Sequence, residues 1–388
     1  MRIQAKKLLA AGAFAGLGIV GMSRTFLGTA LPAVRAALNL SLFQVGSLPA
    51  LLMLGFSVAV FIGGPLSDLL NKKRLLMLGL FLVGASLALF GFSFMFLVSL
   101  SIVVLMGIGG GLIESSSNPL LIRLFPGRET TIMNLHHFFF AAGSLVGPLV
   151  MGTLLSQEIP WRWGYVGFGA LVVIIPVALA FSGQTIREKG QYLNLASVGQ
   201  ILSNRAFQVF SFLIFFSSGI QNGIAYWMVT FLKDVRGFAI AIASLSLSLF
   251  FICLALGRLS TSYLITRFNE VYYMIGLLCL LAVALWLAII VEGHLVIVFF
   301  SICGLAHSGV LPISLGITGR IFSQNPGTPM GMLVTASGLG AAILPWFMSL
   351  IADLTTLKTG FMVFEIMALF CIVVLGANSK WLALSAKK

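Results

Sequence analysis

The sequence GPLSDLLNKKR at residues 64–74 separates two apolar runs and contains a single acid followed by three consecutive cations. Each neighbouring run is long enough to form a helix across the hydrocarbon core of a bilayer, which takes about 20 apolar residues. Charged residues concentrate at the ends of such helices, where the chain meets water. The segment therefore predicts a short turn at one membrane surface between two spanning helices.

A partial copy of this turn lies in the second half of the chain, where GRL at residues 257–259 is followed by Arg267. Other residues recur at nearly the same separation, and a four-residue insertion accounts for its change from 193 to 197 positions. The pairs are Gly64 and Gly257, Arg74 and Arg267, and Pro119 and Pro312 at 193, then Gly143 and Gly340, and Pro148 and Pro345 at 197. The chain is therefore expected to contain two copies of one helical unit.

Composition extends this prediction to all 388 residues. Hydrophobic residues make up 59% of the chain and charged residues 9%, whereas about a quarter of the residues in soluble domains are charged. At about 30 residues for each span and its connection, the length allows about twelve spans and excludes an enzyme carried on a globular head. Apolar runs predict helices at residues 8–35, 41–67, 74–92, 95–123, 131–155, 163–183, 206–232, 239–265, 271–291, 295–321, 330–353 and 360–378.

The longest polar connection divides the chain into two halves. We expect an N-terminal six-helix bundle at residues 1–183, a cytoplasmic linker at 184–205 and a C-terminal six-helix bundle at 206–388. The predicted fold class is an all-α membrane protein with twelve transmembrane helices in two six-helix pseudo-repeats. Parallel repeats of this kind are typical of secondary transporters, whose binding site lies near the membrane midplane between the repeats.

The basic residues predict the orientation of the helices. Of the 23 Lys and Arg residues, 16 fall in segments on the side of the N-terminus and 5 on the opposite side. Because cytoplasmic loops are enriched in Lys and Arg, both termini are expected in the cytoplasm and the protein in the cell inner membrane. The net charge of +13 follows from this distribution, so no nucleic-acid partner is expected.

Charged residues near the middle of predicted spans are the sharpest functional signal. An acid at the bilayer centre costs at least ~2.5 kcal/mol and normally faces a cavity or a partner on an ion path. Glu114 is therefore a candidate proton-binding residue, with a permanent ion pair that only fixes helix packing as the alternative. Arg24 needs a carboxylate, a cavity or an anionic substrate, so its partner is either Glu114 or the substrate. His307, 193 positions after Glu114, can titrate near physiological pH or simply pack.

The segment GIQNGIAYW at residues 219–227 combines amides with aromatic rings on one predicted helix. Sugars are bound by such pairs, because amides hydrogen-bond hydroxyl groups and an aromatic ring covers the apolar face of the sugar. Gln221, Asn222, Tyr226 and Trp227 are therefore candidate substrate contacts. Trp227 is near the end of the predicted helix, and a place in the aromatic belt at the membrane surface is the alternative for it.

Several motifs in the chain occur in one known family of transporters. The turn at residues 64–74 and its copy at 257–267 resemble the signature loop of the major facilitator superfamily. A narrower resemblance, to the fucose–galactose–glucose:proton symporter family, covers most of the chain. It rests on GIGGGLIE at 107–114 followed by Asn118-Pro119, NLHHF at 134–138, and GLGAAILP at 338–345 closing at Ala352-Asp353.

This resemblance implies roles for individual residues. Glu114 takes the place of the proton-linked acid that faces the substrate, Asn118 belongs to the same motif, and His137 is a candidate sugar contact. The family places a second acid in the first helix, where this chain has Gly28, and that departure puts a two-acid scheme in doubt. The resemblance implies a small-molecule substrate moved with protons in preference to sodium, by a monomer in the lipid bilayer.

Residues of the two signature loops are expected to form a cytoplasmic gate. An acid facing a cluster of cations can make charge-assisted hydrogen bonds that hold two helices together in one transport state. The alternative, chiefly for Lys72 and Lys73, is that these cations have no gating role and only reflect the enrichment of Lys and Arg in cytoplasmic loops. The gate candidates are Asp68, Lys72, Lys73, Arg74, Arg258 and Arg267.

Other functions are compatible with parts of the sequence. The segment GSLVGP at residues 143–148 is similar to an element of superfamily antiporters, so a drug or lipid exporter driven by proton antiport is one alternative. Arg24 makes an organic-anion carrier a second alternative. A receptor that no longer transports would have no use for costly intramembrane charges. The sequence contains no phosphate-binding loop, metal-ligand cluster or nucleophile–base pair, so neither catalysis, a cofactor nor a metal is expected. Uptake and export are not distinguished.

Overall fold

The computed structural model describes residues 2–69, 71–126, 129–181, 195–322 and 327–385, and these form fourteen helices without a strand. Twelve stretches among them are long and apolar enough to cross a membrane. The helices are α1 (Arg2–Leu38), α2 (Leu42–Leu69), α3 (Lys72–Gly91), α4 (Phe96–Leu124), α5 (Glu129–Ser156), α6 (Trp161–Ala180), α7 (Leu195–Ser203), α8 (Arg205–Asp234), α9 (Ile240–Leu264), α10 (Glu270–Ile290), α11 (Leu295–Ala306), α12 (Val310–Ile321), α13 (Gly327–Leu354) and α14 (Leu357–Ser385).

The chain divides into two compact units, Met1–Tyr192 and Leu193–Lys388. The N-terminal unit contains α1 to α6 and the C-terminal unit α7 to α14. Within the expected linker at residues 184–205, the structure has the short helix α7, which sequence analysis did not predict, and residues 184–194 lie outside the described part of the chain.

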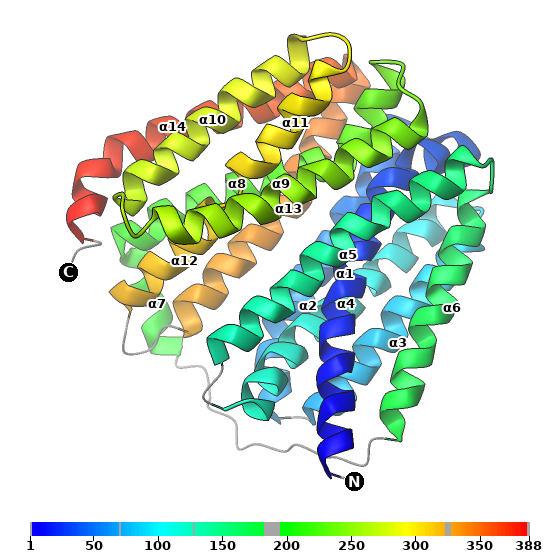
Figure 1. The fold of residues 1–388 in the computed structure, drawn as a ribbon, viewed down its shortest axis with the longest axis horizontal. Coiled ribbons are helices and arrows are strands. Elements are labelled where there is room, and N and C mark those ends of the chain that lie inside the picture. The colour runs from blue at the N-terminus through cyan, green and yellow to red at the C-terminus, as the bar shows by residue number, and fades with distance from the viewer. Residues whose placement is uncertain (1, 70, 127–128, 182–194, 323–326, 386–388) are drawn as a thin grey trace. The chain divides into compact units, whose positions relative to one another are not determined.

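Glycine residues bring α1 and α5 into backbone contact in the N-terminal unit, where the two helices lie side by side (Figure 1). A methyl group on Gly143 of α5 would collide with the carbonyl oxygen of Gly18 in α1. The C-terminal unit has the same arrangement, because a methyl group on Gly340 of α13 would collide with the carbonyl oxygen of Phe215 in α8. Both members of the second contact lie 197 positions after their counterparts (340 − 143 and 215 − 18).

A second contact is also repeated between the units. Gly63 in α2 packs against the side chain of Ser115 in α4, and Gly257 in α9, 194 positions later (257 − 63), packs against that of Ser308. Ser308 follows Ser115 by 193 positions (308 − 115). The repeat separations therefore correspond to repeated helix packing, and the prediction of an all-α membrane fold with two six-helix pseudo-repeats is confirmed.

The α1–α5 contact gives a test of the fold. Gly143→Ala is expected to lower the free energy of unfolding by about 1–3 kcal/mol, the usual cost of an added carbon in a packed interior. The matched control is Gly167→Ala in α6, where the added methyl group would meet nothing within 4 Å. Both variants gain the same helix propensity, so their difference in thermal stability isolates the clash. Equal melting temperatures would contradict the close approach of α1 and α5.

The predicted helix at residues 295–321 is wrong in one respect, because the structure divides it into α11 and α12 at residues 307–309. Pro312 has no N–H and its ring crowds the carbonyl group four residues earlier, which belongs to Ser308. The backbone hydrogen bonds shift accordingly: the Ser308 N–H donates to the carbonyl of Leu305, 3.1 Å away and only three residues back. The corresponding Pro119 lies within the uninterrupted α4.

The third membrane-spanning helix of each unit begins with an asparagine cap. The side chain of Asn71 accepts a hydrogen bond from the Lys73 N–H in α3, and that of Asn269 accepts one from the Val271 N–H in α10. Arg74 therefore lies inside α3, whereas Arg267 precedes the cap of α10. The sequence pairing of Arg74 with Arg267 is not kept in the structure, because the turn before α10 is longer.

Candidate functional site

Glu114 belongs to a hydrogen-bonded network that joins three helices of the N-terminal unit. The Asn118 amide nitrogen donates to Glu114 Oε1 over 3.2 Å, one turn apart on α4. The Asn118 Oδ1 lies 3.0 Å from Nδ1 of His136 in α5, and His136 Nε2 lies 3.2 Å from the carbonyl oxygen of Ala13 in α1. Glu114 is half-buried and His136 is fully buried. The network therefore connects a partly accessible acid to a fully enclosed imidazole.

The network contains His136 and not its neighbour His137, the candidate sugar contact of the sequence resemblance. Successive residues on a helix point about 100° apart, because a turn contains about 3.6 residues. His137 is consequently exposed, with its ring centroid 5.8 Å from that of His136. His136 lies beside Asn118 only because α4 and α5 pack together. No local sequence pattern predicts this contact.

Arg24 in α1 contacts two aromatic rings. Its guanidinium carbon lies 4.2 Å from the ring centroid of Phe56 in α2 and 5.5 Å from that of Phe140 in α5. A planar cation over aromatic faces gains about 0.5–2 kcal/mol, more when it is desolvated. Arg24 is therefore stabilised as a half-buried cation among α1, α2 and α5 of the N-terminal unit.

The packing of α1 on α4 fixes the levels of Arg24 and Glu114. Gly16 lies against Ile113, and Gly110 lies against Val20, so the two helices run in opposite directions. Arg24 is one turn beyond Val20 and Glu114 one turn beyond Gly110 in the other direction. Eight residues of helix rise place them at levels about 12 Å apart. The two side chains are thus at different depths of the same unit.

In the C-terminal unit, His307 lies at the interruption between α11 and α12. Its ring is buried, with Nδ1 3.4 Å from the Ser217 hydroxyl in α8. The neighbouring Ser308 hydroxyl lies 3.2 Å from Thr261 Oγ1 in α9, and that oxygen lies 3.1 Å from the Tyr273 hydroxyl in α10. The broken helix is therefore tied to three other helices by hydroxyl groups.

The four candidate sugar contacts lie together on α8 but differ in accessibility. Gln221 and Asn222 are half-buried, and the Asn222 amide donates to the Ser218 carbonyl 2.8 Å away. Tyr226 and Trp227 are fully buried. A fully buried indole has no place in an aromatic belt at the membrane surface, so that alternative for Trp227 is wrong.

The gate candidates of the first signature loop are only partly described. The side chain of Asp68 lies outside the described residues. Lys72 and Lys73 are buried, and the Lys73 ammonium donates to the carbonyl of Ala180 at the end of α6 over 3.4 Å. Burial distinguishes these two lysines from solvated surface charges, whereas Arg74 is exposed.

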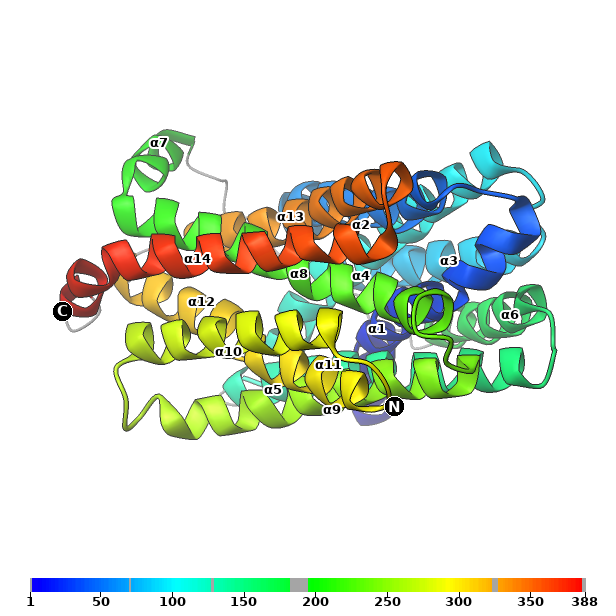
Figure 2. The same cartoon turned by 90° about the horizontal axis from the view of Figure 1, so that it is seen from above.

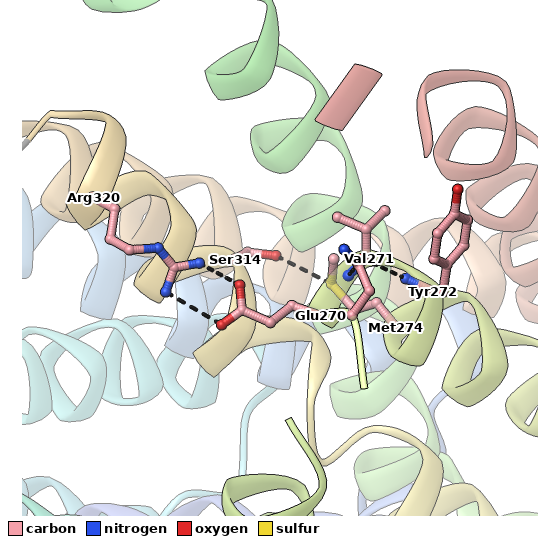
Figure 3. Close-up of polar contacts among 7 residues, drawn as sticks. Glu270, Val271, Tyr272, Met274, Ser314 and Arg320 are labelled. Atoms are coloured by element: carbon pink, nitrogen blue, oxygen red, sulfur yellow. Dashed lines mark hydrogen bonds and ion pairs between the residues drawn. The ribbon is translucent and has the colours of Figure 1, made fainter. Parts of the chain in front are cut away.

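In the second loop, Arg258 is half-buried in α9, and the exposed Arg267 stacks on Tyr263 with 4.8 Å between its guanidinium carbon and the ring centroid. Sequence analysis missed the ion pair nearby. Both guanidinium nitrogens of Arg320 at the end of α12 contact the Glu270 carboxylate at the start of α10 (Figure 3). This pair joins the end of α12 to the start of α10.

Sequence analysis also missed Glu365, an acid in α14. This helix packs alongside α8 and α13 (Figure 2). Glu365 is 7% exposed and follows the buried Phe361 and Phe364 on the same helix. Its Oε2 atom has no hydrogen-bond partner in the described part of the chain. The rule that selects Glu114, an acid within an apolar run, applies equally to Glu365. Among the residues that the structure describes, no group of three or more His, Cys, Asp or Glu side chains is placed to hold a metal ion.

Comparisons with known proteins agree with this architecture. The family model of the Major Facilitator Superfamily matches residues 13–291 and 212–382. A TsgA homologue of Erwinia tasmaniensis is 28% identical over 180 residues, which is 45% of each chain, so the match spans less than half of that relative's length. The MFS-type transporter YfkL of Bacillus subtilis, described as uncharacterised, is 23% identical over 363 residues, or 88% of each chain.

A solved structure extends the similarity of fold to nearly the whole chain. The crystal structure of a mutant of the nucleoside transporter NupG superposes with a TM-score of 0.81 at 15% identity, covering 96% of this chain and 99% of that one. The family match covers most of the residues that form the twelve spans. The protein is an integral membrane secondary transporter and belongs to the Major Facilitator Superfamily.

Proposed function

We propose that this transporter moves a small polar solute, a sugar or a sugar-like compound, by alternating access coupled to protons that bind Glu114. The observation that carries the proposal is the Glu114–Asn118–His136 network, in which an acid at membrane depth has polar partners and a partly open side. Acids that are kept at such depth serve ion or proton paths. The half-buried amides of Gln221 and Asn222 support a hydroxyl-rich solute, because amides both donate and accept hydrogen bonds.

A second candidate function is an organic-anion carrier. It is favoured by Arg24, a cation at membrane depth whose guanidinium stacks on Phe56 and Phe140. Such a stack holds the planar group in one orientation, which suits a carboxylate or phosphate ligand. Export by proton antiport is compatible with the same two residues, because the direction of coupling depends on the order of binding steps.

A ligand screen distinguishes these substrate classes. Any ligand that binds only the folded protein raises its apparent stability, by about 2.7 kcal/mol at a concentration 100-fold above Kd. The purified protein is expected to show a higher melting temperature with neutral sugars or nucleosides, and an unchanged melting temperature with lysolipids or cationic drugs. Stabilisation by sugar acids alone, lost in Arg24→Ala, would establish the organic-anion carrier instead.

The proposed orientation, with both termini in the cytoplasm, is tested by labelling. In a variant without the four native cysteines, Gln157→Cys between α5 and α6 is expected to react with an impermeant thiol reagent added to sealed, right-side-out cells. Ser203→Cys in α7 is the matched control and should react only after the membrane is opened. Both positions are exposed. Labelling of Ser203→Cys from outside would reverse the orientation inferred from loop charge.

A further inference from the structure

The contacts of His136 cannot all be hydrogen bonds in one neutral state. Asn118 Oδ1 and the Ala13 carbonyl oxygen are acceptors only, and each faces a nitrogen of the His136 ring, at 3.0 Å and 3.2 Å. A neutral imidazole carries hydrogen on one nitrogen and a lone pair on the other. When Asn118 donates to Glu114, a neutral ring can donate to only one of these two oxygens. The shorter contact, with Asn118 Oδ1 at 3.0 Å, favours the hydrogen on Nδ1, and the lone pair of Nε2 then faces the Ala13 oxygen.

A half-turn of the Asn118 amide removes this conflict, provided that Glu114 is protonated. The two ends of an amide have the same shape, so the side chain occupies the same space after the turn. The Glu114 O–H then donates to Asn118 Oδ1, and the Asn118 amide nitrogen donates to His136 Nδ1. The ring hydrogen moves to Nε2 and donates to the Ala13 carbonyl, so that every group of the network is satisfied.

We propose that Asn118 and His136 form a relay by which protonation of Glu114 on α4 makes a hydrogen bond between α5 and α1. This inference rests on the proposed role of Glu114 and gives it a mechanical consequence. His136 is a positioning residue in the relay, since its ring is fully buried. The bond forms on the side of α1 that also carries the Gly18–Gly143 contact, so proton binding tightens a helix pair whose backbones already touch.

Other charges near the ring do not replace Glu114 in this role. His137 is adjacent on α5, with 5.8 Å between the ring centroids, and carries no hydrogen bond to the network. On α1, Lys6 is two turns from Ala13 and its ammonium lies over the Phe125 ring, and Arg24 is three turns away in the other direction. The remaining cations with described side chains on the helices packed against α5 are Lys7 and Arg35 on α1, Arg123 on α4 and Arg162 on α6.

The relay makes an unusual prediction for nitrogen-15 magnetic resonance of the full-length protein with labelled histidine. Acidification is expected to remove the hydrogen from His136 Nδ1, because protonation of Glu114 turns the Asn118 donor toward that nitrogen. An ordinary histidine gains hydrogen on acidification. This direction holds even if the ring is doubly protonated while Glu114 is ionised, since Nδ1 then also carries hydrogen. His136→Gln assigns the signal among the four histidines of the chain.

Three variants separate the relay from a passive packing role. Glu114→Gln imitates the protonated acid and is expected to hold the hydrogen on Nε2 at every pH. Asn118→Leu breaks the relay and should leave Nδ1 insensitive to Glu114, while His137→Gln, the matched control, should switch like the parent. An Nδ1 hydrogen that persists on acidification, or identical titration in Glu114→Gln and the parent, would overturn the relay.

The same experiment is independent of the proposed function. A parent protein whose tautomer does not change, although Glu114→Gln abolishes proton-coupled transport, refutes the relay and leaves the function intact. A tautomer that switches in a protein whose transport ignores the pH gradient supports the relay and refutes proton coupling. The tautomer measurement itself needs no transported solute.

Discussion

Glu114→Gln is expected to abolish the accumulation of solute by a pH gradient while leaving exchange of solute across the membrane intact. A glutamine side chain is neutral at every pH and has the shape of the protonated acid, so alternation between the two access states continues without a proton. With one proton per solute, a pH difference of one unit drives an accumulation of about tenfold. The variant should therefore equilibrate its solute to a ratio of about one instead of about ten.

The measurement is uptake of labelled solute into proteoliposomes with an imposed pH gradient, paired with counterflow, which needs no gradient. Glu270→Gln is the matched control. Glu270 is an acid of the C-terminal unit, and its ion pair with Arg320 lies at a helix end. It should accumulate solute like the parent. Concentrative uptake by Glu114→Gln at the parent rate would exclude proton coupling through this residue and direct attention to Glu365 and His307.

Arg24→Ala is expected to shift the pH dependence of transport upward. A nearby cation favours the ionised form of an acid, so proton-coupled transport through Glu114 should persist to higher pH once Arg24 is removed. At a level difference of about 12 Å the interaction passes through protein and water, and the shift should stay below about one pH unit, the equivalent of 1.36 kcal/mol. Loss of the contact with the Phe56 ring should also lower the free energy of unfolding by about 0.5–2 kcal/mol.

Arg24→Lys separates charge from stacking and orientation. Lysine keeps the positive charge without the planar guanidinium, so the pH profile of this variant should remain near that of the parent. Uptake of neutral sugar as a function of pH in the two variants and the parent is the measurement. Complete loss of ligand binding in Arg24→Ala, with an unchanged pH profile for residual transport, would show that Arg24 holds an anionic solute.

Patterns of apolar residues predict most of the fold. The twelve spans follow from composition and periodicity, because a bilayer requires long helices that satisfy their own backbone. The repeat separation of 197 corresponds to a glycine contact in both units, and that of 193 to the serine partners Ser115 and Ser308 of a second glycine contact. The interruption at residues 307–309 is not predicted from the sequence. Pro119 and Pro312 occupy equivalent positions of the two repeats, yet only Pro312 breaks its helix. Proline within a spanning helix is tolerated or not according to its neighbours.

The candidate site is less predictable than the fold. Glu114 and Arg24 are recognisable because charge at membrane depth is costly, and Asn118 shares a helix face with Glu114 one turn away. The choice of His136 over His137 depends on how α5 rotates against α1 and α4. The pairing of Arg320 with Glu270 depends on where α12 ends relative to α10. These contacts join residues distant in sequence, so no local pattern predicts them.

The most direct test of the account is whether protons move with the solute. Proteoliposomes containing the protein and a trapped pH indicator, without any initial gradient, receive a sugar or nucleoside that stabilises the purified protein. The account predicts that the indicator records acidification inside the vesicles in step with solute entry, and none with Glu114→Gln. Solute entry by the parent protein without proton movement, or entry that requires sodium, would contradict it.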